Sequence, residues 1–329
     1  MHIPDGFING ATSAGAVVVA VGGVGAALRA GGRSLKERQI PMAGLSAAFI
    51  FVLQMLNFPV AAGTSGHLLG GALAAILLGP TLGITVVAVV VIIQALIFAD
   101  GGIVALGLNV INIAVITALV AWASFKGVMK VLPKRTPSVL GATMVAAWAS
   151  VVASSLGFVL QYALGGNGGV DIGTVFGAMV GVHAVIGIGE GLITATIVGA
   201  VLAVRPDLVT GVAPYGMVRH TGSAPSRRAM SGFVAAGLVA AFALVAFVAP
   251  IASPDPDGLE KVAEDTGFIV TAEDHPIGGP LADYGVAGVD NEWLGTIVAG
   301  VVGTVITFGV GLVLVGMARR RRAEEPTGA

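Results

Sequence analysis

Long apolar stretches, separated by short polar segments, follow one another along almost the whole chain. Most of them reach the length that an α-helix needs to cross a bilayer, about 20 predominantly apolar residues. We therefore predict an all-α integral membrane protein with nine spans, near residues 9–28, 41–57, 66–79, 81–98, 103–125, 138–163, 173–204, 231–250 and 294–317. The third stretch is short and is expected to be tilted, broken or only partly membrane-crossing.

The composition agrees with a membrane protein, since 56% of the 329 residues are hydrophobic and 11% are charged. A soluble globular class is excluded, and the expected surroundings are a lipid bilayer rather than nucleic acid. The absence of cysteine excludes disulfides, thiolate metal sites and thiol catalysis. Neither Gly-Lys-Ser nor Gly-Lys-Thr occurs, so the chain lacks a Walker A loop for ATP.

Positive charge is distributed unevenly between alternate loops. If the N-terminus is outside, all 17 lysines and arginines except Lys261 lie on the cytoplasmic side. These residues are Arg29, Arg33, Lys36, Arg38, Lys126, Lys130, Lys134, Arg135, Arg205, Arg219, Arg227, Arg228 and Arg319 to Arg322. The positive-inside rule therefore predicts an outer N-terminus and a cytoplasmic C-terminus.

The polar stretch at residues 206–230, rich in Gly, Pro, Ser and Arg, is interpreted as a cytoplasmic linker. It divides a seven-helix domain, residues 1–205, from a two-helix domain, residues 231–329. The outer loop of the second domain is crowded with acidic residues. Its field would gather cations; a solvated connector is the alternative.

The first two residues, Met1 and His2, offer three nitrogens to one metal ion. The α-amine of Met1, the backbone nitrogen of His2 and the imidazole Nδ1 of His2 can close a five-membered and a six-membered ring. Such a plane of nitrogens suits Ni(II) or Cu(II), which displace the amide proton. This expectation requires that Met1 is retained and that no signal peptide precedes it. The alternative is a chance histidine at an ordered start of the chain.

A histidine near the outer end of the third stretch, His67, can supply the fourth nitrogen. It lies among small residues in Gly63–Gly71, which allow another segment to come close. Taken alone, a histidine near a membrane interface is more often structural. The neighbouring chelate on the same side of the membrane favours a ligand.

Two further polar groups lie within or beside the apolar stretches. His183 and Glu190 are seven residues apart and share a helical face. An isolated ionised carboxylate at mid-membrane costs roughly 2.5 to 3.5 kcal/mol, so Glu190 must be protonated, partnered or directed into a polar cavity. We favour a structural or subunit-coupling role for the pair; a proton relay in a proton-coupled secondary metal transporter is the alternative.

The second group consists of polar residues that are expected to hold the segments around the proposed site in place. Asp100 precedes a helix and is expected to cap its free amides. Asn109 and Asn112 are one turn apart and are expected to bond a neighbouring helix or to hold the N-terminal loop. Asp5, in the opening motif, is grouped with them as a supporting residue.

Five motifs occur in a fixed order: HIPDGF at residues 2–7, GTSGHLLGG at 63–71, LGP at 78–80, DGGIVALGLN at 100–109 and HAVIGIGEGLIT at 183–194. Together they resemble the CbiM/NikM family, the substrate-capture subunits of energy-coupling-factor transporters for cobalt and nickel. The resemblance covers roughly residues 1–205. Residues 256–265, PDGLEKVAED, resemble the PDGLE component, similar in role to CbiN/NikN subunits, here fused to the capture domain.

The resemblance implies a transported ion, Ni(II) or Co(II), bound by the Met1 amine, the His2 amide and imidazole, and the His67 imidazole, with no resident cofactor. It implies a CbiQ/NikQ-like coupling subunit and CbiO/NikO-like ATPases in the cytoplasmic membrane, and a link to cobalamin biosynthesis. Square-planar nitrogen ligation and the PDGLE tail favour nickel. An intramembrane metalloenzyme is disfavoured, because His-Glu-x-x-His is absent and a four-nitrogen site leaves no catalytic position.

Overall fold

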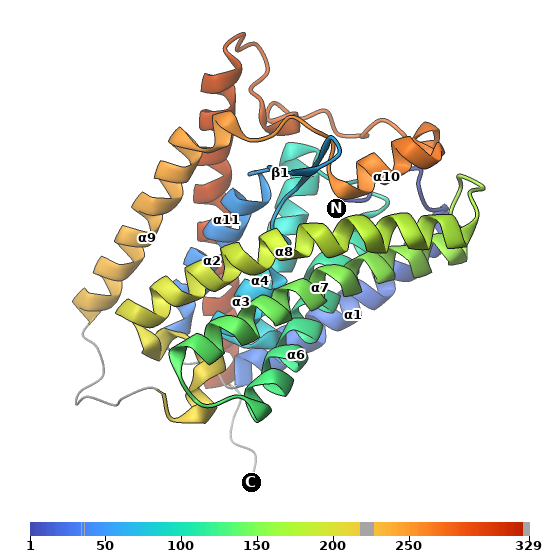
Figure 1. The fold of residues 1–329 in the computed structure, drawn as a ribbon. Helices are drawn as coiled ribbons and strands as arrows, with labels where there is room; N and C mark the ends of the chain where they lie inside the picture. Colours follow the sequence, from blue (N-terminus) through green and yellow to red (C-terminus); the bar gives the residue numbers. More distant parts are fainter. Residues whose placement is uncertain (34, 36, 218–226, 325–329) are drawn as a thin grey trace.

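The computed structural model describes residues 1–33, 35, 37–217 and 227–324, which are mostly helical (Figure 1). The longer helices are α1 (Gly10–Arg33), α2 (Gln39–Gln54), α4 (Pro80–Ile93), α6 (Thr117–Val131), α7 (Thr136–Gly165), α8 (Ile172–Val204), α9 (Arg227–Phe247) and α11 (Glu292–Glu324). Shorter elements are α3 (Gly71–Leu78), α5 (Leu106–Asn109), α10 (Gly258–Thr266) and an antiparallel hairpin of β1 (Phe58–Ala61) and β2 (Thr64–Gly66). The all-α membrane class is confirmed.

Seven of the nine expected spans are long apolar helices in the described part of the chain, at residues 10–32, 80–98, 106–131, 136–165, 172–204, 228–251 and 292–319. Helix α2 is shorter, with 16 residues, and α3 has only 8. Eight residues make about 12 Å of helix, less than half of the hydrocarbon thickness. The expected helical span over 66–79 is therefore wrong in extent, because α3 starts only at Gly71.

The late start of α3 follows from close packing at two glycines. Gly70 has φ of +82°, a conformation that favours glycine. A Cβ atom on Gly71 would lie 1.8 Å from Oγ1 of Thr117 in α6, so only glycine fits between the two helices. The chain thus enters the bundle without regular structure at His67 and becomes helical deeper inside.

Two π-helical segments adjoin the turns that carry candidate site residues. One, Gln94–Phe98, ends α4, and the other, Val110–Ile116, links α5 to α6. Wide helical turns of this kind occur frequently at functional sites. The first is followed by Ala99, whose φ of +55° turns the chain toward Asp100.

The segments predicted to be external lie together at one end of the bundle. Residues 1–7, the β1–β2 hairpin, the turn at 99–102 and parts of residues 252–291 contact one another there. Arg38, Arg205 and Asp207 meet at the opposite end, where the Arg38 guanidinium lies 3.8 Å from Asp207. This grouping agrees with the prediction that successive loops lie alternately at the two ends of the bundle. The side of the membrane that each end faces stays a prediction. Lys36 and Arg219 lie outside the described residues.

The two helices of the C-terminal domain pack directly on α2. A Cβ atom on Gly44 of α2 would lie 2.8 Å from the Phe308 carbonyl oxygen of α11, and one on Gly303 of α11 would lie 2.0 Å from the Phe51 ring. Small residues let apolar helices approach this closely. Between α9 and α11 the chain crosses the outer end of the bundle, where α10 lies over α8 (Figure 1).

The expected linker is folded in its first part. Residues 206–217 form two 3-10 helices, Pro206–Leu208 and Thr210–Tyr215, with Leu208 and Val212 buried. These apolar side chains anchor the segment against the bundle. Residues 218–226 of the expected linker and residues 325–329 of the expected second domain lie outside the described residues.

Candidate metal site

The N-terminal segment is held in place by an asparagine of α5. Asn109 accepts a hydrogen bond from the Ile3 backbone N–H at 2.8 Å and donates one to the Ile3 carbonyl oxygen at 3.0 Å. The Gly102 N–H donates to the same carbonyl at 2.9 Å. The backbone just after His2 is therefore fixed on both sides.

Asp5 binds the amides of the turn that leads into α5, although Asp100 was expected to do so. The Asp5 carboxylate accepts hydrogen bonds from the N–H groups of Ile103 and Ala105, both at 3.0 Å. The capping prediction for Asp100 is wrong, because a side chain from a distant part of the sequence already binds these amides. Asp100 instead contacts His2 and Tyr284.

His67 is positioned by a close approach of the hairpin to α8. A Cβ atom on Gly66 would lie 2.7 Å from the Ile186 side chain, so glycine is required next to the histidine. On the other side of His67, the backbone N–H groups of Leu69 and Gly70 donate to Glu190 at 2.8 and 3.2 Å. Glu190 of α8 therefore binds two backbone amides just before α3 and fixes the backbone that carries His67.

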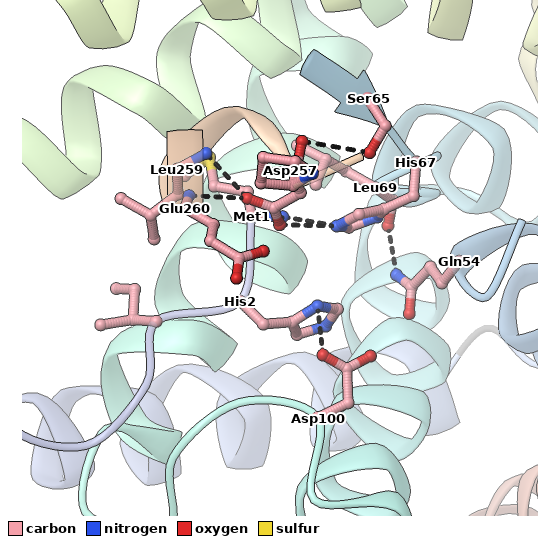
Figure 2. A network of polar contacts seen from close by, with 12 residues as sticks. Met1, His2, Gln54, Ser65, His67, Leu69, Asp100, Asp257, Leu259 and Glu260 are labelled. Carbon is pink, nitrogen blue, oxygen red and sulfur yellow. Dashed lines mark hydrogen bonds and ion pairs between the residues drawn. The ribbon is translucent and has the colours of Figure 1, made fainter. Parts of the chain in front are cut away.

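Two of the predicted ligands are brought into direct contact. The Met1 amine contacts both Nε2 of His67 and Oδ2 of Asp257, and that carboxylate oxygen lies 3.5 Å from Nε2 of His67 (Figure 2). Met1 and His67 are only 3% and 5% exposed. The amine and the imidazole nitrogen thus face each other where both residues are buried, beside a carboxylate from the C-terminal domain.

His2 is adjacent, but its Nδ1 faces away from the Met1 amine. Nδ1 lies 3.0 Å from Oδ1 of Asp100, and the imidazole stacks on that of His67 with ring centroids 5.1 Å apart (Figure 2). Nε2 of His2 is buried without a hydrogen-bond partner. The predicted chelate is therefore not closed in this structure, and closing it requires Nδ1 to leave Asp100.

The surroundings of the site favour the neutral imidazole of His67, which is the form that binds a metal ion. They also favour the ionised carboxylates of Asp257 and Asp100. Burial, followed by the charge of the Met1 ammonium, lowers the pKa of His67, so its imidazole stays neutral. Burial alone would raise the pKa of Asp257, but the Met1 ammonium and His67 hold it well below its usual value. At Asp100, burial is likewise outweighed by His2 and by the Tyr284 hydroxyl, which lower its pKa.

The remaining predicted residues, His183 and Asn112, do not enter the cluster. His183 is buried, lines a small pocket together with Met1 and His67, and its Nδ1 bonds the Met179 carbonyl at 2.8 Å. Asn112 exchanges two side-chain hydrogen bonds with Gln161 of α7, at 2.8 and 3.0 Å. Asn112 thus joins two helices, while Asn109 holds the N-terminal loop.

Sequence reasoning did not single out Asp257 or Tyr284 as site residues. Asp257 lies in the PDGLE motif, which was the available signal, and Tyr284 donates to Asp100 at 2.5 Å. Both come from the segment between α9 and α11, which covers the N-terminus. No local pattern relates residues so distant in sequence.

The site opens into a cavity of about 850 Å³ that both domains line. Its acidic lining comprises Asp5, Asp100, Asp257, Glu260, Glu273, Asp274 and Asp283. Within the described residues no three His, Cys, Asp or Glu side chains converge as a metal site. A metal ion at Met1 and His67 would therefore depend on backbone nitrogens as well as on imidazoles.

Comparison with known proteins covers both domains. Residues 2–208 match the CbiM family, described as cobalt uptake substrate-specific transmembrane region, and residues 231–320 match the PDGLE domain. A protein of Archaeoglobus fulgidus, provisionally named fused nickel transport protein NikMN, is 33% identical over 97% of this chain and 99% of its own length. The cobalt transport protein CbiM of Geobacter sulfurreducens is 32% identical over 63% of this chain and 59% of its own length.

A solved structure agrees with this relationship. The crystal structure of a truncated transition metal transporter is 29% identical, with a TM-score of 0.54 over 62% of this chain and 99% of that chain. The sequence motifs, the helical membrane fold and both domain matches lead to one conclusion. The chain belongs to the CbiM family of metal-uptake membrane proteins and carries a C-terminal PDGLE domain.

Proposed function

We propose that this protein is the substrate-specific component of an energy-coupling-factor transporter and captures Ni(II) or Co(II) from outside the cytoplasmic membrane. The observation that carries the proposal is the contact of the Met1 amine with Nε2 of His67, with the His2 imidazole stacked beside them. Three of the four proposed donor groups thus lie in one buried cluster, and the His2 amide lies between two of them in the chain.

Loading exchanges protons for the metal ion. The α-amine of Met1 loses the proton that makes it an ammonium, and the backbone amide of His2 loses its hydrogen as nickel binds. One divalent ion enters as two protons leave, so the net charge of the buried site is unchanged. His2 Nδ1 must turn from Asp100 to complete the chelate, and that carboxylate lines the cavity through which the ion would arrive.

Energy comes from other subunits in this proposal. The chain has no Walker A sequence, so a CbiQ/NikQ-like coupling protein and CbiO/NikO-like ATPases would drive release to the cytoplasm. Planar nitrogen ligation suits Ni(II), and fused relatives are named as nickel transport proteins. We therefore propose nickel as the preferred ion.

The test is uptake of radiolabelled nickel and cobalt by cells that express the chain with or without the coupling protein and ATPases. We expect uptake only with all components, its loss in His67→Ala, and near wild-type uptake in the control Thr196→Ala, an exposed residue of α8 whose hydroxyl bonds the Leu192 carbonyl of the same helix. Uptake that persists without the ATPases and stops with a protonophore would instead support the proton-coupled alternative.

A further inference from the structure

We propose that Asp257 is a positioning residue of the metal site, which holds the Met1 amine beside His67 and balances the charge of the bound ion. The C-terminal domain would then supply part of the site itself. This inference rests on the proposed function, since it assigns a role relative to the ion at Met1, His2 and His67.

The two oxygens of Asp257 have separate partners. Oδ1 accepts hydrogen bonds from the N–H groups of Leu259 and Glu260, at 2.8 and 3.0 Å, and so caps α10. Oδ2 contacts the Met1 amine and lies 3.5 Å from Nε2 of His67. Capping thereby fixes the direction in which the second oxygen points.

The segment that carries Asp257 is itself clamped to the membrane domain. The Ser65 N–H donates to the Pro256 carbonyl at 2.9 Å, and the Ser65 hydroxyl donates to the Asp255 carbonyl at 2.7 Å. A Cβ atom on Gly258 would lie 2.5 Å from the Ile186 side chain of α8. Asp257 is therefore held between the hairpin that leads into His67 and the helix behind it.

One carboxylate serves the site before and after loading. Before loading it pairs with the ammonium of Met1. After loading, the divalent ion and the deprotonated His2 amide leave one positive charge, which the same carboxylate balances. The metal-bound amine retains N–H groups that can donate to Oδ2, and hydrogen bonds of this kind orient metal ligands; losing them typically costs about 10- to 100-fold in metal affinity.

Two substitutions separate this role from helix capping. Asparagine caps helices about as well as aspartate, so Asp257→Asn keeps α10 but removes the charge, whereas Asp257→Ala removes both. Asp265→Asn is the matched control: it makes the same change in the same helix, at a carboxylate that bonds Lys261 at 2.7 Å.

The measurement is titration of Ni(II) into the full chain in detergent, with the absorption spectrum of the bound ion recorded. We expect about 10- to 100-fold weaker binding for both Asp257 variants, an unchanged ligand-field band, and wild-type affinity for Asp265→Asn. Wild-type affinity of Asp257→Asn would overturn the proposal, and so would a shifted band, because it would make Asp257 a direct ligand. Normal nickel binding by His67→Ala would contradict the proposed metal site itself. If His67→Ala loses binding and Asp257→Asn keeps it, only the role proposed for Asp257 fails.

Discussion

Replacing Glu190 tests whether this buried carboxylate holds the fold of the site or carries protons. Its two oxygens accept the N–H groups of Leu69 and Gly70 at the start of α3. A buried N–H left without a partner costs about 1–3 kcal/mol. Glu190→Ala should therefore lower the free energy of unfolding by about 2–6 kcal/mol, since two such groups lose their acceptor.

Glu190→Gln should have about half of that effect. Its single carbonyl oxygen can still accept one amide, while its NH₂ group faces the other, so we expect a loss of about 1–3 kcal/mol. Both variants should also weaken nickel binding, because His67 precedes the two bound amides by only two and three residues. The control is Thr196→Ala, since Thr196 is an exposed residue of α8 whose hydroxyl donates to the Leu192 carbonyl of the same helix. This variant should keep wild-type nickel affinity.

The assay is denaturant unfolding of the purified protein in mixed micelles, followed by nickel titration of each variant. Unfolding of Glu190→Ala at the wild-type free energy would refute the stabilising role of these two hydrogen bonds. Loss of uptake in Glu190→Gln, with both stability and nickel affinity unchanged, would indicate proton transfer through Glu190.

Two further predictions concern the N-terminal segment. Asn109→Ala removes both hydrogen bonds to Ile3, about 1–3 kcal/mol in total, and should weaken nickel binding about 5- to 150-fold. Asn112→Ala, which breaks only the link to Gln161, should leave the nickel dissociation constant unchanged; equal effects of both variants would contradict the assigned roles. Gly102→Ala would place a Cβ atom 2.0 Å from the Asp5 carboxylate, so it should displace the N-terminal segment and reduce nickel binding. The control Gly181→Ala places its Cβ atom in open space on α8 and should bind nickel as the wild type does. Nickel titration of both variants checks this prediction.

Hydropathy was sufficient to predict the long helices of this fold, because a bilayer requires continuous apolar stretches. It failed at α3, where His67–Gly70 enter the bundle without helical hydrogen bonds and Glu190 binds the free amides. Residues 66–79 are apolar because they are buried, and the length of this apolar stretch therefore does not give the length of the helix.

Chemistry and motif singled out Met1, His2 and His67 as candidate ligands; the structure places the Met1 amine against His67, and their role as metal ligands stays a prediction. The contacts of the surrounding carboxylates were not predicted. Asp5 binds the turn amides that the local sequence had assigned to Asp100, and Asp257 contacts Met1 although they lie 256 residues apart in the sequence. Such pairings depend on tertiary packing, which residue spacing does not encode.

The most direct test of the proposed capture site is nickel titration of the native chain against a version with one residue added before Met1, both tagged only at the C-terminus. The extension converts the α-amine into an amide, removes one donor and pushes new atoms into the contact with His67 and Asp257. We predict that the native chain binds one nickel ion and that the extended chain loses this binding. Equal affinity of the two proteins would contradict a metal site at Met1, His2 and His67.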